Sequence, residues 1–219
     1  AIQLPRAGTT QTHHGIDYIY NSLGYRTHET VKEHIVVCGC SHTEGVGLHY
    51  QDTWVCQLET QLDTQVVNIA LAGSSADFVS QNLAQWCTKF TPLAVIAQWP
   101  NVFRAIHWKN SKSILVNSNA NDELYRQKLL QGDEHFLLTF VKNVVYLDNI
   151  CKLKNIPLIH IYFDSPGPEQ ALLEIQGITM HYDLKLAGKT WHFDSGATDG
   201  VHHSKWCHTQ WIHRIRKLL

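Results

Sequence analysis

Three patterns that would point to a particular partner or compartment are missing from this 219-residue chain. Its 18 basic and 19 acidic side chains form no basic stripe or charge block, which argues against a nucleic-acid partner. No apolar run approaches the roughly 20 residues that are needed to span a bilayer. Residues 1–12 lack a charged segment followed by an apolar one, so we expect a cytoplasmic protein, with export left open.

The cysteines and histidines follow no ligand or disulfide pattern. The six cysteines, at positions 38, 40, 56, 87, 151 and 207, match neither a zinc motif nor a compact disulfide framework. Most of them lie in apolar segments, where a thiol packs as a small hydrophobic group. The 15 histidines include the pairs His13-His14 and His202-His203, but no His-Glu-x-x-His motif. We therefore expect reduced thiols, no metal and no cofactor.

The length and the apolar pattern predict one domain. Residues 1–30 are rich in Gly, Thr, His and Pro and are expected to form an irregular lead-in, followed by a single domain over residues 31–219. Strands are predicted over residues 34–38, 66–71, 93–98, 157–163 and 178–184. Helices are predicted over residues 52–62, 79–90, 133–154, 169–175 and 204–219. The pattern specifies no oligomeric state.

Alternation of strands and helices predicts an α/β fold, with a mostly parallel sheet covered by helices on both faces. Right-handed crossovers bring every strand-to-helix turn to one edge of such a sheet. Polar and small residues at the ends of the strands are therefore expected to meet at that edge, where ligands of open α/β sheets bind.

The first strand ends in the stretch Gly39-Cys40-Ser41. Gly39 is expected to allow a tight turn, which would leave the Ser41 hydroxyl at the carboxyl end of the strand. Ser41 is then either a nucleophile or the cap of the next helix.

A second polar stretch, Thr198-Asp199-Gly200-Val201-His202, precedes the last helix. An Asp three residues before a His can receive one imidazole N–H, which fixes the tautomer and stabilises the imidazolium. The alternative is a plain loop in which Asp199 caps the helix and the histidines are solvated.

Together with the turns after the second and third strands, these stretches resemble the SGNH, or GDSL-type, hydrolase family over roughly residues 21–219. The resemblance implies Ser41 as nucleophile, His202 as general base and Asp199 as the group that orients it. It also implies an oxyanion hole from the N–H groups of Ser41 and Gly73 and the side-chain amide of Asn101. The fold implied is a three-layer, flavodoxin-like sandwich with a five-stranded sheet in the order 2-1-3-4-5.

Two motifs depart from the family pattern. The usual Gly-Asp-Ser reads Gly39-Cys40-Ser41, which removes a carboxylate that is not part of the triad. The usual Gly-x-Asn-Asp reads Trp99-Pro100-Asn101-Val102, which keeps the asparagine but not its neighbours.

Three residues near these motifs are candidates for a substrate pocket. Each also has an ordinary structural explanation: His42 as a neighbour of the nucleophile, Trp99 as a core residue at a strand end, and Arg104 as half of a surface salt bridge. The resemblance implies a serine esterase that cleaves a small acyl or acetyl ester, such as an O-acylated carbohydrate. The alternatives are an acyltransferase with the same site and a binding protein on the same fold.

Overall fold

A five-stranded sheet forms the centre of the protein in the computed structural model, which describes residues 6–109, 112–116, 132–162, 167–182, 197–200 and 202–219. Its strands are β3 (Ile35–Cys38), β4 (Val66–Asn68), β5 (Ala94–Trp99), β8 (Leu158–Tyr162) and β9 (Met180–Tyr182). They lie in the order β4-β3-β5-β8-β9, which is the expected order 2-1-3-4-5. All four pairings are parallel, so the carboxyl ends of the strands share one edge.

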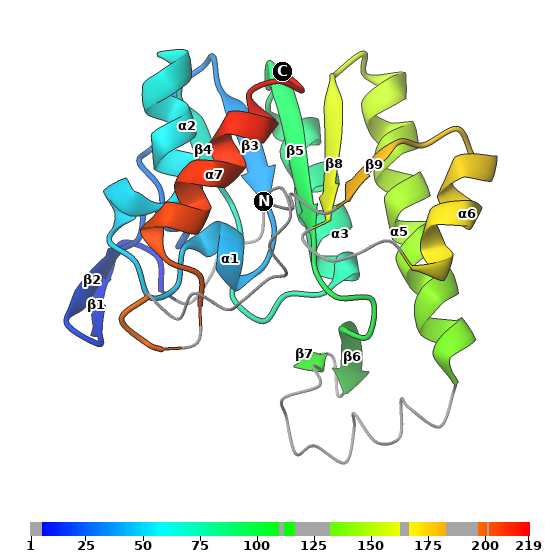
Figure 1. Cartoon of the computed structure of the whole chain (residues 1–219), viewed down its shortest axis with the longest axis horizontal. Helices are drawn as coiled ribbons and strands as arrows, with labels where there is room; N and C mark the ends of the chain where they lie inside the picture. Colours follow the sequence, from blue (N-terminus) through cyan, green and yellow to red (C-terminus); the bar gives the residue numbers. More distant parts are fainter. Residues whose placement is uncertain (1–5, 110–111, 117–131, 163–166, 183–196, 201) are drawn as a thin grey trace.

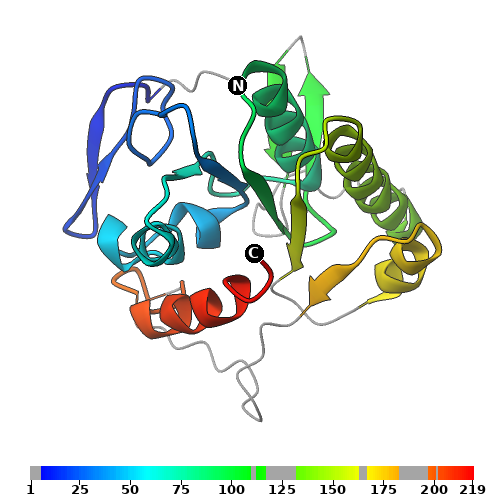
Figure 2. The same ribbon diagram turned by 90° about the horizontal axis from the view of Figure 1, so that it is seen from above.

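Helices cover both faces of the sheet (Figures 1 and 2). The helices are α1 (Ser41–Glu44), α2 (Trp54–Leu62), α3 (Ala76–Lys89), α5 (Asp133–Leu153), α6 (Pro168–Ile175) and α7 (Lys205–Ile215), with a 3-10 turn η1 (Tyr50–Asp52) before α2. Ile35 and Val37 of β3 pack in a cluster with α2 and α7, whereas Val36 and Cys38 pack in a cluster with α3 and α5. This alternation produces the three layers, because successive side chains of a strand point to opposite faces.

Two short hairpins are added to this core. The lead-in, expected to be irregular, contains the antiparallel pair β1 (Thr10–His13) and β2 (Ile16–Ile19). His14 and Gly15 connect them with φ angles of 50° and 75°, as in the two-residue turns that suit the twist of a hairpin. The polar stretch after β5 contains a second pair, β6 (Ala105–Lys109) and β7 (Lys112–Val116).

The predicted start of one helix, at residue 52, needs correction, because α2 begins at Trp54. The cap of α2 is Thr53, whose hydroxyl accepts from the Cys56 N–H at 3.3 Å, and Asp52 belongs to the preceding 3-10 turn.

None of the six cysteines, all within the described ranges, forms a disulfide. Among the helices described here, none is long and apolar enough to cross a membrane.

A buried histidine links α7 to α2. His208 of α7 is 1% exposed, and its Nδ1 accepts the Trp54 N–H at 2.9 Å. Trp54 is the first residue of α2, so the ring satisfies one of the N–H groups that a helix start leaves without a partner. Burial, followed by the charges of His203 and His202, lowers the pKa of His208 to about 3.

We predict that the unfolding free energy decreases as the pH falls from about 6.5 toward 3, because the unfolded chain protonates His208 and the folded chain does not. At pH 5 this histidine accounts for about 2 kcal/mol of the decrease. Urea unfolding at pH 7.5 and pH 5 measures it. His208→Gln should flatten the pH dependence, and His213→Gln, an exposed position on the same helix, should not. Equal slopes for His208→Gln and the unmodified protein would contradict this assignment.

Candidate active site

Ser41 is the first residue of α1 and follows the carboxyl end of β3. It is buried, and the turn before it is held by Gln98 of β5. Gln98 Oε1 accepts from the Cys40 N–H at 3.2 Å, from the Cys40 thiol at 3.3 Å and from the Thr43 hydroxyl at 3.0 Å. Three donors on one buried amide oxygen fix the main chain on both sides of Ser41.

Gly39 is needed in this turn for space rather than for backbone freedom. It is not among the glycines with positive φ. A Cβ at this position would lie 2.6 Å from Gln98 Oε1 and closer still to the Thr43 hydroxyl, which is nearer than any real contact. Gly39 was expected to allow the tight turn through its backbone freedom, and this is wrong: it does so by leaving room for the side chains of Gln98 and Thr43.

The other end of α1 is held by buried charges. Glu44 is 2% exposed, pairs with Arg6 at 2.7 Å and accepts the Ala72 N–H at 2.6 Å. Arg26 donates to the carbonyls of Glu44, Gly45 and Leu48 at 3.3, 2.6 and 2.6 Å. Residues of the lead-in therefore support the helix that carries Ser41.

Gly73 lies in the turn between β4 and α3, with a φ angle of +76°. The next residue, Ser74, donates from its hydroxyl to the Gly39 carbonyl at 2.9 Å. The Gly73 turn is thus attached to the Ser41 turn, where the resemblance requires an N–H donor.

Asp199 and His202 form a close pair. The distance from His202 Nδ1 to Asp199 Oδ2 is 2.6 Å, and Asp199 Oδ1 accepts the His202 main-chain N–H at 3.0 Å. Because Nδ1 faces a carboxylate, the proton of the neutral ring belongs on Nδ1 and Nε2 keeps its lone pair. Ser204 occupies the N-cap position of α7, so Asp199 does not cap that helix.

The Asp199 loop is joined to the segment that follows α1. The Gly47 carbonyl accepts from the Thr198 N–H at 3.0 Å and from its hydroxyl at 3.1 Å. Gly47, with a φ of +81°, in turn donates its N–H to the Tyr18 hydroxyl at 2.8 Å. These contacts bring two segments about 150 residues apart in sequence into one site.

His42, next to Ser41, lies against the second half of the site. Its ring centroid is 5.5 Å from that of His202 and 4.8 Å from that of His203. Burial, followed by the charges of His203 and His202, holds the pKa of His42 well below its usual range, so the ring is neutral.

The contact between the rings of His42 and His202 places Ser41 and His202 at the same edge of the sheet. The hydrogen bond between them is not formed among the described residues and stays a prediction, since such bonds tighten when substrate binds.

Asn101 follows β5 and is exposed. Its Oδ1 accepts the Phe103 N–H at 3.0 Å, which restrains the amide and leaves the NH₂ group as the donor of this side chain. The residue therefore lies at the predicted edge with a donor group available to a ligand.

Of the pocket candidates, Trp99 is a core residue. It is 1% exposed, its Nε1 donates to His160 Nδ1 at 3.0 Å, and its ring contacts Phe140 of α5. Of the two alternatives that the sequence left open for Trp99, these contacts favour the core residue at a strand end. Arg104 lies in the turn after Asn101, where its N–H donates to the Asn101 carbonyl at 3.1 Å.

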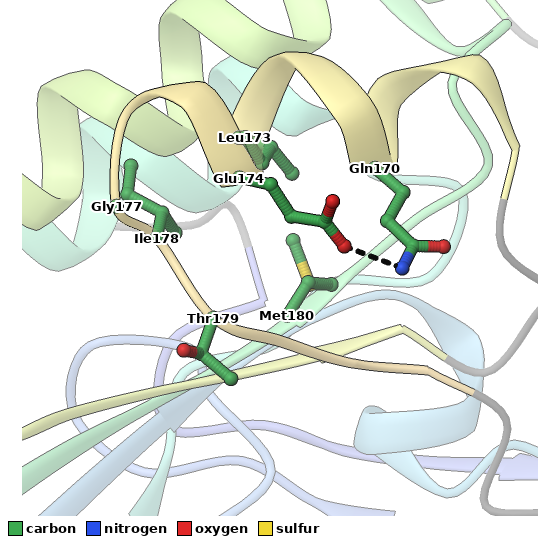
Figure 3. A pocket seen from close by; sticks show the side chains of 7 residues that line it. All are labelled: Gln170, Leu173, Glu174, Gly177, Ile178, Thr179 and Met180. Carbon is green, nitrogen blue, oxygen red and sulfur yellow. Dashed lines mark hydrogen bonds between the residues drawn. The ribbon is translucent and has the colours of Figure 1, made fainter.

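One hollow, of about 270 Å³, lies apart from this group of residues, between α6 and β9. There Gln170 donates to Glu174 at 2.6 Å beside Met180 (Figure 3). Strands β5 and β8 separate β9 from β3 and Ser41. No group of three potential metal ligands occurs among the described residues.

Gln98, Arg26 and Tyr18 support the site but were not identified from the sequence. Gln98 is the one polar side chain in the strand Ala94–Trp99, and a polar group in a buried strand needs a partner. That signal was present in the sequence.

Comparisons with known proteins establish the fold. No known family model matches the chain, and no curated protein matches it. Solved structures do match, and they show that the chain has the fold of GDSL-type, or SGNH, hydrolases, as the resemblance predicted.

Three of these structures show the extent of the likeness. The esterase EstA from Pseudoalteromonas sp. is 16% identical with a TM-score of 0.55, covering 85% of this chain and 96% of that one. A member of the lipolytic G-D-S-L family from Veillonella parvula is 13% identical with a TM-score of 0.51, covering 84% and 97%. The acetyl xylan esterase Est2A from Butyrivibrio proteoclasticus is 10% identical with a TM-score of 0.52, covering 87% and 64%. At identities of 10–16%, the likeness shows that the fold is shared and does not show a shared activity.

Gln98→Leu should both destabilise the protein and reduce the reactivity of Ser41. The change leaves the buried Cys40 N–H without an acceptor, at a cost of about 1–3 kcal/mol. Urea unfolding and the rate at which a fluorophosphonate inactivates the protein are the two measurements. The matched control is Gln85→Leu, an exposed position on α3, which should change stability by less than about 0.5 kcal/mol. Equal stability and reactivity in both variants would show that Gln98 does not hold the turn.

Proposed function

We propose that the protein is a serine esterase that hydrolyses small acyl or acetyl esters through an acyl-enzyme on Ser41. The observation that carries the proposal is the pairing of two parts: a serine on a tightly held turn, and an Asp199–His202 dyad at the same edge of the sheet. The contact between the rings of His42 and His202 joins the two parts.

In the first half-reaction, the Ser41 oxygen attacks the ester carbonyl carbon while His202 Nε2 takes the hydroxyl proton. Asp199 holds the tautomer and stabilises the imidazolium. The tetrahedral intermediate then collapses, and the alcohol leaves with the proton from His202. In the second half-reaction, water attacks the acyl-enzyme, His202 takes its proton and returns it to Ser41, and the acid is released.

The developing negative oxygen needs donors that are already in place. The proposed donors are the N–H groups of Ser41 and Gly73 and the amide NH₂ of Asn101. Two features support this set: the Gly73 turn is attached to Gly39, and the Asn101 amide is restrained by the Phe103 N–H. Each such donor is typically worth about 2.7–4 kcal/mol of transition-state stabilisation.

Two observations favour an ester as the substrate. Among the structural neighbours, EstA is an esterase in a form inhibited by monoethylphosphonate, and Est2A is an acetyl xylan esterase. An O-acetylated carbohydrate is therefore one proposed substrate class, and acyl transfer to a sugar or alcohol is the second candidate. A screen of products with added acceptors separates transfer from hydrolysis.

The rate of hydrolysis of a short-chain ester tests the proposal. Ser41→Ala and His202→Ala should each reduce kcat by at least about 10³-fold, and Asp199→Asn by a comparable factor, because the amide stabilises the wrong tautomer. Asn101→Ala should reduce kcat by about 10²–10³-fold.

His203→Ala serves as the control for the position of the base, because His203 adjoins His202 in sequence. It should lose far less activity than His202→Ala. The reverse order would move the general base to His203. Unchanged rates in all four site variants would show that the activity belongs to another site or another protein, and would end the serine-esterase proposal.

A further inference from the structure

Arg104 is held beside the candidate site by a rigid turn. Its main-chain N–H donates to the Asn101 carbonyl, and Asn101 Oδ1 accepts the Phe103 N–H within the same turn. The Phe103 ring packs edge-on against Phe136 of α5, with centroids 5.7 Å apart. The backbone of Arg104 is therefore fixed relative to Asn101.

The guanidinium of Arg104 has no partner among the residues that the structure describes. Its Nη1 is buried and makes no hydrogen bond, and no ion pair involves this side chain. Two other arginines near the site, Arg6 and Arg26, also have one buried nitrogen without a hydrogen bond, but their guanidinium groups have protein partners. Arg6 pairs with Glu44, and Arg26 donates to three carbonyls. The expected surface salt bridge of Arg104 is thus not formed within the described part of the chain. A buried cationic N–H without an acceptor is costly unless a ligand or water supplies one.

The surroundings of Arg104 favour an anion from outside the protein. Its turn follows β5, and β5 pairs with β3 through Ala97 and Cys38, directly before the Ser41 turn. The charge of Arg104 is also among the causes that lower the pKa of His42, after burial and the three neighbouring histidines. The nearby acid of the site, Asp199, already faces His202. Arg104 therefore adds a positive charge, which no carboxylate in the described ranges neutralises, to the edge where the ester would bind.

We propose that Arg104 binds an anionic group of the substrate, a carboxylate or a phosphate, and so selects esters that carry one. The proposal rests on the esterase function above. Arginine suits this task because its planar donors match two oxygens of either group. The turn fixes the backbone from which the guanidinium extends, and the substrate anion would supply an acceptor that the described residues do not.

Matched ester pairs test the selection. 3-Acetoxybenzoate and 3-acetoxybenzamide differ only in charge on the alcohol side, and monophenyl succinate and phenyl succinamate differ only on the acyl side. 3-Acetoxyphenyl phosphate tests whether a phosphate is accepted in place of the carboxylate. At low salt, kcat/KM for the charged member of at least one pair should exceed that of its neutral partner by about 10-fold or more. The ratio should decrease as salt is added.

Arg104→Gln should reduce the ratio of kcat/KM for the charged ester to kcat/KM for the neutral ester by about 10-fold. Arg104→Lys should reduce it less, because lysine keeps the positive charge but lacks the planar pair of guanidinium donors. The matched control is Arg216→Gln, an exposed position at the end of α7, which should keep the ratio. A ratio near one in the unmodified protein overturns the proposal. So does an equal loss on both members of a pair in Arg104→Gln, since that would indicate a structural or oxyanion role.

Binding without turnover separates this inference from the esterase proposal. In the Ser41→Ala variant, calorimetry with the charged and neutral ester of each pair should show at least about 10-fold tighter binding of the charged ester in at least one pair, lost when Arg104→Gln is added. Selective binding in a protein that hydrolyses no ester would support the anion site and overturn the esterase. Hydrolysis of an ester, with no tighter binding of the charged ester in any of the pairs, would support the esterase and overturn the anion site.

Discussion

The arrangement of the site depends on one buried amide oxygen. Gln98 Oε1, inside the sheet, accepts three hydrogen bonds, two from Cys40 in the turn before α1 and one from Thr43 within α1. Gly39 leaves the space for that side chain, since any Cβ there would collide with it. A neutral amide therefore orders the turn before Ser41 in a chain where Cys40 stands in place of the acidic residue of the GDSL motif. The thiol takes part by donating to the same oxygen.

A second constraint joins the two halves of the site. Gly47, just after α1, accepts two hydrogen bonds from Thr198 and donates one to the Tyr18 hydroxyl. The lead-in hairpin, the segment after α1 and the Asp199 loop thus form one supported unit. We therefore expect this hairpin outside the sheet to affect the proposed chemistry, because it supports the main chain on which the spacing of Ser41 and His202 depends.

The sequence was informative where local pattern determines structure. Apolar runs and helical stripes predicted the five strands and their order of appearance, and Asp199 with His202 was identifiable because three-residue spacing allows their contact. Features set by tertiary packing were not predictable in the same way. Whether Trp99 lines a pocket or the core depends on Phe140 and His160, which are distant in sequence. The first hairpin could have been expected from the glycine in its turn.

The central claim is that Ser41 is a nucleophile activated by the Asp199–His202 dyad. The most direct measurement is mass spectrometry of peptides after reaction with a fluorophosphonate, in which the serine oxygen displaces fluoride and forms a bond to phosphorus. The account predicts a single phosphonyl adduct on the peptide that contains Ser41, formed much more slowly in His202→Ala and absent in Ser41→Ala. An unmodified Ser41, or equal labelling with and without His202, would contradict it.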